Sequence, residues 1–139
     1  MNCKLFLLLV ILFSVQIVFA QKKPTNVKII HTDSSKIVYG RASFYSKSLE
    51  GTRTAMGGRY HHEKMTAASN FFKLGTWVRV TRIATGKSVI VYINDRTHPS
   101  MAKRGRVVDL SRAAAIALKI ISAGVVKVKV ESVDEGTVE

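Results

Sequence analysis

Residues 77–83 read Trp-Val-Arg-Val-Thr-Arg-Ile, and residues 88–93 read Ser-Val-Ile-Val-Tyr-Ile. Apolar and polar side chains alternate in both stretches, which is typical of strands with one buried face. The four residues between them include Gly86, whose backbone freedom suits a tight turn. We therefore expect the two strands to pair antiparallel as a hairpin.

The same alternation recurs elsewhere in the chain. Further strands are expected at residues 126–131, 37–45, 65–68 and 106–110. Ser111 can cap a short alanine-rich helix over residues 112–119, which ends before Gly124. Six short strands and one short helix predict a mainly β protein, folded as a closed or nearly closed barrel without exposed sheet edges.

The first 20 residues have the composition of an export signal. Lys4 supplies positive charge ahead of an apolar run over residues 5–18, and Val18-Phe19-Ala20 has the small-residue pattern of a cleavage site. We expect cleavage after Ala20 and a mature chain of residues 21–139. The alternative is an uncleaved membrane anchor, because the run approaches the ~17 residues of a short spanning helix. In both cases the domain lies outside the cytoplasm.

Cysteine usage and charge restrict the function classes. Cys3 is the only cysteine and precedes the apolar run, so the mature chain has no disulfide and no lipid-attachment cysteine. Without Lys4 the chain keeps 21 of its 22 Lys and Arg residues against 9 acidic residues, a net charge of +12. This balance indicates a polyanionic partner, and export favours wall polymers or anionic lipid headgroups over nucleic acid.

The mature chain has the length of a single domain with a modest core. Residues 21–36 are polar without sustained periodicity and are expected to form a flexible leader. The domain itself is expected over residues 37–133, with residues 134–139 as a tail. We expect a monomer with no stable membrane insertion once the signal is removed.

Six short blocks along the chain form a recognisable series. They are Ala42-Ser43-Phe44-Tyr45, Arg53-Thr54-Ala55-Met56-Gly57, Thr66-Ala67-Ala68, residues 74–81, Ile93-Asn94-Asp95-Arg96 and residues 108–115. In this order and spacing they resemble the rare lipoprotein A family of peptidoglycan lytic transglycosylases, over about residues 40–130. The resemblance implies a six-stranded double-psi β-barrel and no cofactor. It also implies cleavage between N-acetylmuramic acid and N-acetylglucosamine without water, which leaves 1,6-anhydromuramoyl ends, in cell-wall remodelling or daughter-cell separation.

The catalytic groups that the resemblance implies are only partly present. Active family members carry an acidic residue at the position of Gly58, a histidine at the position of Ser69 and the aspartate of the Asn-Asp-Arg block. In this chain only the aspartate, Asp95, is in register. Asp95 is therefore the predicted general acid and later base, a role for which its carboxyl must carry a proton when the reaction starts.

Other interpretations of this departure stay open. Glu63, His61 or His62 can reach the site from the loop after Tyr60 and replace the missing groups. Alternatively, catalysis is lost and the groove binds or loosens glycan, as the expansins do, whose barrel is similar. Separately, Asp95 can have a structural role, as the cap of a turn at the strand end. A basic adhesion protein with the barrel as its scaffold is a third alternative.

The remaining candidates are assigned by residue type. Aromatic faces and donors for sugar rings are expected from Tyr45, Arg53, Thr54, Tyr60, Asn94 and Arg96. Asp109 is expected to be structural, because a carboxylate just before Ser111 favours the positive end of the following helix. No metal is expected at His61 and His62, since adjacent histidines point apart in an extended chain and no third ligand is evident.

Overall fold

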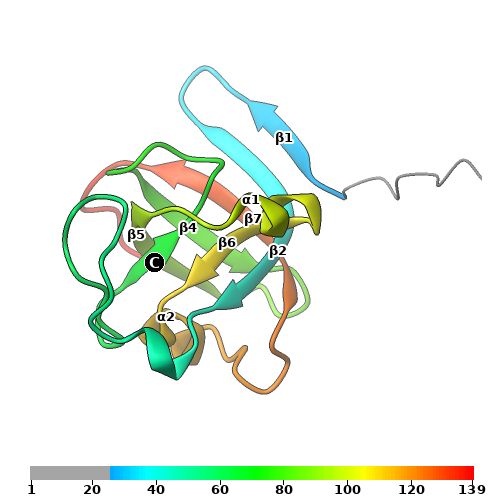
Figure 1. Cartoon of the computed structure of the whole chain (residues 1–139). Helices are drawn as coiled ribbons and strands as arrows, with labels where there is room; N and C mark the ends of the chain where they lie inside the picture. Colours follow the sequence, from blue (N-terminus) through cyan, green and yellow to red (C-terminus); the bar gives the residue numbers. More distant parts are fainter. Residues whose placement is uncertain (1–25) are drawn as a thin grey trace, which may run out of the picture.

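The computed structural model describes residues 26–139 (Figure 1). The predicted signal peptide and residues 21–25 lie outside the described residues. The strands are β1 (Lys28–His31), β2 (Lys36–Phe44), β3 (Thr66–Ala68), β4 (Trp77–Arg82), β5 (Ser88–Asp95), β6 (Arg106–Leu110) and β7 (Val126–Val133). The helices are α1 (Pro99–Lys103) and α2 (Arg112–Ala117), with a 3₁₀ turn, η2, at Lys47–Leu49. Within the described part of the chain, no helix is both long and apolar enough to cross a membrane.

Strands β2 to β7 close into a barrel. The strands are hydrogen-bonded in the order β1-β2-β6-β3-β5-β4-β7, and a further pairing of β2 with β7 closes the ring. The pairs β2 with β6 and β3 with β5 are parallel, whereas the other pairs are antiparallel. Among the described strands, β1 alone extends outside the ring (Figure 1). The predicted barrel and all six predicted strands are therefore confirmed.

The barrel interior is filled by alternating side chains of its strands. Val78 and Val80 of β4 and Val89, Val91 and Ile93 of β5 are at most 2% exposed. The residues between them are partly exposed, so the two faces of each strand are separated as predicted. Burial of each such side chain contributes roughly 1.5–3 kcal/mol to folding. The predicted hairpin is confirmed by the antiparallel pairing of β4 with β5.

Helix α2 begins at the predicted position. The Ser111 hydroxyl accepts a hydrogen bond from the Ala114 N–H and so satisfies a free donor of the first turn. The helix ends at Ala117, two residues before the predicted end, because Lys119 has a φ of 57°, which no right-handed helix continues. Ala114 and Ala115 are fully buried, and their small side chains let the helix lie against the barrel.

Two elements go beyond the prediction. Strand β1 lies within the predicted flexible leader and pairs antiparallel with the first residues of β2. Its side chains are mostly exposed, so it has no alternating pattern to detect. Helix α1 is too short to show a helical period. Its start is stabilised by Pro99 and by the His98 ring, which accepts a hydrogen bond from the Ser100 N–H.

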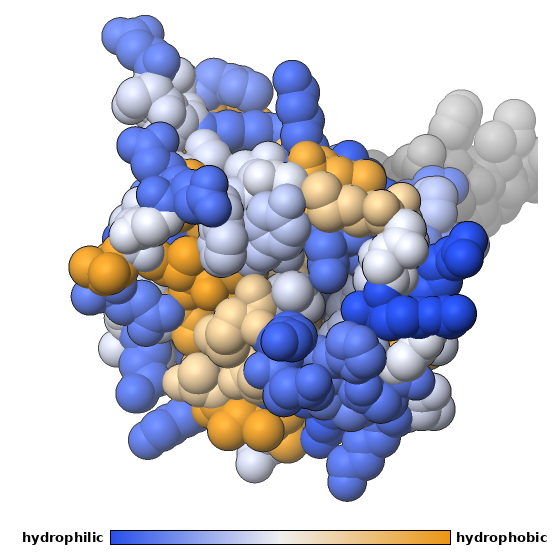
Figure 2. Space-filling view, turned by 90° about the vertical axis from the view of Figure 1, so that its left-hand side faces the viewer, coloured by the Kyte–Doolittle hydropathy of each residue, from blue (hydrophilic) through white to orange (hydrophobic). Residues whose placement is uncertain are grey.

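The molecular surface is rich in hydrophilic side chains. Figure 2 shows a face on which hydrophilic residues surround a smaller apolar area. Among residues 26–139, ion pairs between acidic residues and Lys or Arg engage Arg79, Arg106 and Lys129. Most of the basic side chains that produce the net positive charge are therefore free to meet an anionic partner.

Candidate active-site groove

An open groove lies where β2, β3 and β5 end beside β6. Ala68, the last residue of β3, pairs with Asp95 of β5 on one side and with Asp109 of β6 on the other. The groove has a volume of about 610 Å³, within the range of small-molecule sites. Its lining includes Tyr45, Arg53, Asp95, His98, Arg106 and Asp109. The topology therefore brings two carboxylates to one concave surface.

The Asp95 carboxylate is held by three hydrogen bonds. Oδ1 accepts from the Ala55 N–H and from the Arg96 N–H, both at 2.8 Å. Oδ2 accepts from the Tyr45 hydroxyl at 2.6 Å. A carboxylate offers about four lone-pair sites, so one site on Oδ2 remains for a substrate hydrogen. Asp95 is thus oriented as a reacting group needs to be, by the loop after β2 and by its own strand end.

Tyr45 is the side chain that most directly positions Asp95. Its ring stacks on Tyr60, with ring centroids 3.9 Å apart and an interplanar angle of 19°. Burial raises the pKa of the Tyr45 hydroxyl, and the hydrogen bond to Asp95 raises it further. The hydroxyl therefore stays protonated and acts as a permanent donor. Tyr45 lines the groove as predicted, but it is only 8% exposed and is a partner of Asp95 rather than a free sugar platform.

Tyr45→Phe tests this positioning role. The variant keeps the stacked ring and removes one donor from a charged group, an interaction worth about 1.5–3 kcal/mol. We expect glycan cleavage to slow by roughly 10- to 100-fold with little change in thermal stability. Tyr39→Phe on β2 is the matched control and should leave the rate unchanged. An unaltered rate for Tyr45→Phe would show that the Asp95 orientation does not depend on this bond.

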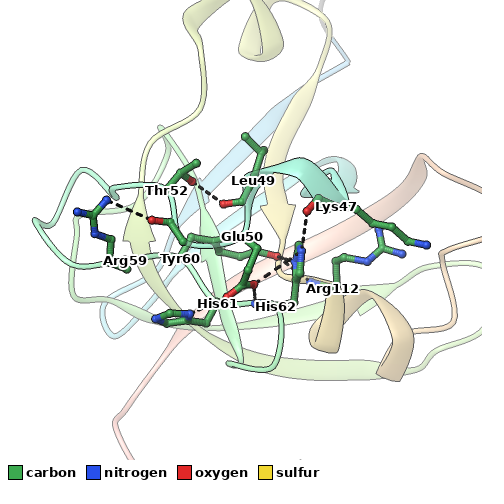
Figure 3. Close-up of polar contacts among 10 residues, drawn as sticks. Lys47, Leu49, Glu50, Thr52, Arg59, Tyr60, His61, His62 and Arg112 are labelled. Atoms are coloured by element: carbon green, nitrogen blue, oxygen red, sulfur yellow. Dashed lines mark hydrogen bonds and ion pairs between the residues drawn. The ribbon is translucent and has the colours of Figure 1, made fainter.

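Tyr60 is not among the residues that line the groove, and Figure 3 shows it beside His62 and Arg112. It is 1% exposed, and its hydroxyl contacts His62 Nδ1 at 2.8 Å and accepts from the Arg112 N–H at 3.2 Å. The other ring nitrogen of His62 lies 3.0 Å from the Lys47 carbonyl. The prediction of Tyr60 as a sugar-binding residue is therefore wrong. The buried ring supports Tyr45 by stacking, and the hydroxyl joins the loop to α2.

The loop histidines converge on Glu50. Glu50 Oε1 lies 2.7 Å from His61 Nδ1, and Oε2 accepts from the His62 N–H at 2.7 Å (Figure 3). These bonds, that of His61 first, lower the pKa of Glu50. Glu63 is exposed and, like both histidines, is not among the residues that line the groove. The structure therefore does not bring Glu63, His61 or His62 to the site as replacements for the missing groups.

Glu50 also belongs to a cluster of three possible metal ligands that the sequence spacing did not reveal. Ligand atoms of Glu50, His61 and Glu63 lie within 4.8 Å of one another on the loop surface, close enough to meet at one metal ion. Two of these residues are exposed. This group lies outside the groove, and the expected absence of a metal from the site stays a prediction.

The other predicted sugar-binding residues divide into two groups. Arg53 is exposed and lines the groove, where it can donate to substrate oxygens. Thr54 is 5% exposed and occupies a tight turn in which its N–H donates to the Gly58 carbonyl. Asn94 lies outside the groove lining, and its buried side-chain oxygen has no partner among the described residues. Thr54 is therefore buried in its turn and does not face the groove, whereas the sugar contact of the partly exposed Asn94 stays a prediction.

Arg96 borders the groove but is turned away from Asp95. Its Nη1 donates to the carbonyl oxygens of Ser69 and Phe72, at 2.5 Å each. Within residues 26–139, no ion pair joins Arg96 to Asp95. The guanidinium thus fixes the turn after β3. Arg96 also lines the groove, and its sugar contact stays a prediction.

The two positions that depart from the family pattern differ in their surroundings. At Gly58 no heavy atom lies within 4 Å of the place where a Cβ would stand. Ser69 is fully buried, donates to the Val107 carbonyl at 2.7 Å and accepts from the Phe71 N–H at 3.1 Å. A histidine has no room at position 69 without a change in this packing.

Asp109 was missed as a groove residue. Its place just before Ser111 and α2 suggested a structural role at the positive end of the helix, whereas the structure places Asp109 in the groove lining. Asp109 accepts two hydrogen bonds from Arg106 on Oδ1, from Nη2 at 2.6 Å and from Nε at 3.2 Å. Burial raises the pKa of Asp109, and the Arg106 pairing opposes this shift. The sequence signal that could have found it is the polar residue at a strand end next to Val107, Val108 and Leu110, all buried.

Sequence comparison identifies relatives of this barrel. The family model described as lytic transglycolase matches residues 37–130. A probable endolytic peptidoglycan transglycosylase RlpA of Nostoc sp. is 47% identical over 94 residues, which cover 66% of this chain and 24% of the relative. One from Treponema pallidum is 40% identical over 110 residues, which cover 78% of this chain and 34% of the relative. The chain thus spans a quarter to a third of the length of these relatives.

Structure comparison confirms the type of barrel. An expansin variant of Clavibacter michiganensis, solved in complex with cellohexaose, matches with a TM-score of 0.55 at 23% identity. The match covers 74% of this chain and 53% of the expansin. Identity at this level shows the fold alone, a double-psi β-barrel, as the sequence resemblance implied. Together with the family match over most of the barrel, it shows that the chain belongs to the lytic transglycolase family of double-psi β-barrel proteins.

Proposed function

We propose that this protein is a peptidoglycan lytic transglycosylase in which Asp95 is the essential acid–base residue. The observation that carries the proposal is the Asp95 carboxylate, oriented by three hydrogen bonds in an open groove. The sequence relatives are named endolytic peptidoglycan transglycosylases, and a groove carboxylate can perform the chemistry of that name.

The reaction needs one proton donor and one proton acceptor. The bond between muramoyl C1 and the glycosidic oxygen breaks, and the muramoyl O6 bonds to C1. The departing oxygen gains a proton, and the C6 hydroxyl loses one. A single carboxyl can serve both steps in turn, so no water, metal or cofactor is consumed. Asp95 Oδ2 accepts one hydrogen bond from Tyr45 and has a lone pair left for these proton transfers.

A non-catalytic glycan-binding function is the second candidate. Gly58 and Ser69 stand where active family members carry an acid and a histidine. Ser69 is buried, and its hydroxyl makes two hydrogen bonds within the protein. The Clavibacter expansin, which has the same fold, is solved with a bound oligosaccharide. In this alternative the groove binds or loosens glycan without cleaving it.

Export and wall association are part of the proposal. The predicted signal over residues 1–20 supports secretion, with the mature domain in the periplasm or outside the cell. The excess of basic side chains supports attraction to the anionic polymers found there. In this proposal the protein acts as a monomer on glycan strands.

The experiment incubates residues 21–139 with purified peptidoglycan that carries or lacks stem peptides. Mass spectrometry of the released fragments distinguishes anhydromuramoyl ends from hydrolysed ends. Anhydromuramoyl products are the expected result. Retention on sedimented wall without any released product would instead support the binding function.

A further inference from the structure

The groove contains two carboxylates with a defined relation. Asp95 on β5 and Asp109 on β6 flank β3, and both pair with Ala68. Neighbouring strands lie about 4.8 Å apart, so the two backbones are roughly 10 Å apart across Ala68. Both side chains line the same open volume. A glycosidic bond can therefore lie between them, with one carboxyl on each side.

The hydrogen-bond partners of the two carboxylates differ. Asp95 accepts from a hydroxyl and two backbone N–H groups, partners that suit an ionised carboxylate. The Asp109 side chain is 15% exposed, and both of its bonds from Arg106 reach Oδ1. No described residue donates to Asp109 Oδ2, so this oxygen is free to carry a proton. Burial raises the pKa of Asp109 despite the Arg106 pairing, so its protonated form persists to higher pH than that of an ordinary aspartate.

Several charged and titratable groups line the same groove as Asp109. They are Arg106 on β6, Tyr45 at the end of β2, Asp95 on β5, and Arg53, Arg96 and His98 on the loops that line the groove. Among these, Arg106 makes the ion pair with Asp109. The negative charge of Asp109 also raises the pKa of Tyr45, which places the two groups within electrostatic reach of each other.

We propose that Asp109 is the proton donor of the transglycosylation and Asp95 the base, a pair that takes the place of the groups absent at Gly58 and Ser69. This inference rests on the proposed function. Asp109 Oδ2 gives its proton to the glycosidic oxygen as the bond to C1 breaks. Asp95 Oδ2 takes the proton of the C6 hydroxyl as O6 bonds to C1. One proton leaves Asp109 and one arrives at Asp95, and exchange with water in the open groove restores the starting state.

The dependence of the cleavage rate on the leaving group distinguishes the general acid from the general base. Asp109→Asn keeps an acceptor for Arg106 and removes the proton, so we expect the rate on natural glycan to fall about 100-fold. On an analogue whose leaving sugar is replaced by 4-nitrophenol, which departs without protonation, the same variant should lose less than about tenfold. Asp95→Asn should be impaired on both substrates, because the C6 proton must still be removed. Circular dichroism and wall sedimentation check that both variants are folded and bind.

The pH profile provides a second readout. The wild-type rate should decline as pH rises through the pKa of Asp109, because only the protonated acid can donate. Arg106→Gln removes the group that opposes the raised pKa, so this alkaline limb should move to higher pH. His98→Gln is the control, since this histidine also lines the groove, and its pH profile should keep the wild-type limb.

The outcomes separate this inference from the proposed function. If the wild type releases anhydromuramoyl ends and Asp109→Asn does so at the wild-type rate, Asp109 is not the acid and the proposed function stands. Equal losses on both substrates, or loss of the alkaline limb in His98→Gln, overturn the assignment in the same way. If the wild type releases no such ends, the proposed function fails and the inference fails with it.

Discussion

Asp95→Asn is expected to lower the rate of glycan cleavage by at least ~100-fold, at the lower end of the ~10²–10⁴-fold effect of general acid–base catalysis. Asparagine has the size of aspartate, and its oxygen can accept from the Ala55 and Arg96 N–H groups. It has no titratable proton in this range, so it can neither donate to the leaving oxygen nor remove the C6 proton. The measurement is the release of anhydromuramoyl fragments by mass spectrometry.

Binding to the wall should survive this substitution. The groove keeps its shape and Arg53 stays available, so sedimentation with peptidoglycan should be nearly unchanged for Asp95→Asn. Asp134→Asn is the matched control, because it makes the same chemical change at an exposed residue of the tail. A substantial residual rate for Asp95→Asn would assign the chemistry to another group. Loss of wall binding as well would show that Asp95 acts through substrate affinity.

Gly40→Ala is expected to destabilise the domain by about 1–3 kcal/mol, the range for forcing an extra carbon into a packed core. A Cβ on Gly40 would stand 2.4 Å from Val107 Cγ1 and 2.9 Å from the Gly105 carbonyl oxygen. The next residue, Arg41, donates its N–H to that same carbonyl at 2.8 Å, so the backbone has little freedom to retreat. Urea unfolding and thermal melting of residues 21–139 measure the loss, which should lower the Tm by several degrees.

Gly58→Ala is the control for this prediction. Its Cβ would meet no heavy atom within 4 Å, so we expect a change within about 0.5 kcal/mol. Because Gly40 lies where β2 meets β6, the strand of Asp109, Gly40→Ala should also slow glycan cleavage. Equal stability of the two variants would show that the β2–β6 contact adapts without cost.

The strands could be predicted because their signal is local. Val78, Val80, Val89 and Val91 alternate with polar residues, and the same alternation separates inside from outside in the barrel. The cap at Ser111 is equally local, since a side-chain oxygen and the N–H that it accepts from are three residues apart. Strand β1 could not be predicted in this way. It is stabilised by backbone pairing with β2 and buries little of its own surface.

The candidate site was only partly predictable. Asp95 was found because it lies in a recognisable block, and the structure places it in the groove. Tyr60 has a plausible residue type for sugar binding, but burial makes it a support for Tyr45. Glu63 was one candidate for a second acid and lies outside the groove, whereas Asp109 lines it. A side chain's residue type does not indicate which surface it reaches.

The sequence by itself determined the mainly β class, the positions of the barrel strands, the start of α2 and the family to which the chain is similar. These features depend on residues close together in the chain, or on blocks in a fixed order. Only the tertiary structure decided that the second carboxylate of the groove is Asp109. The reason is that β3 lies between β5 and β6 and that Ala68 pairs with both acids, a non-local arrangement that barrel closure creates.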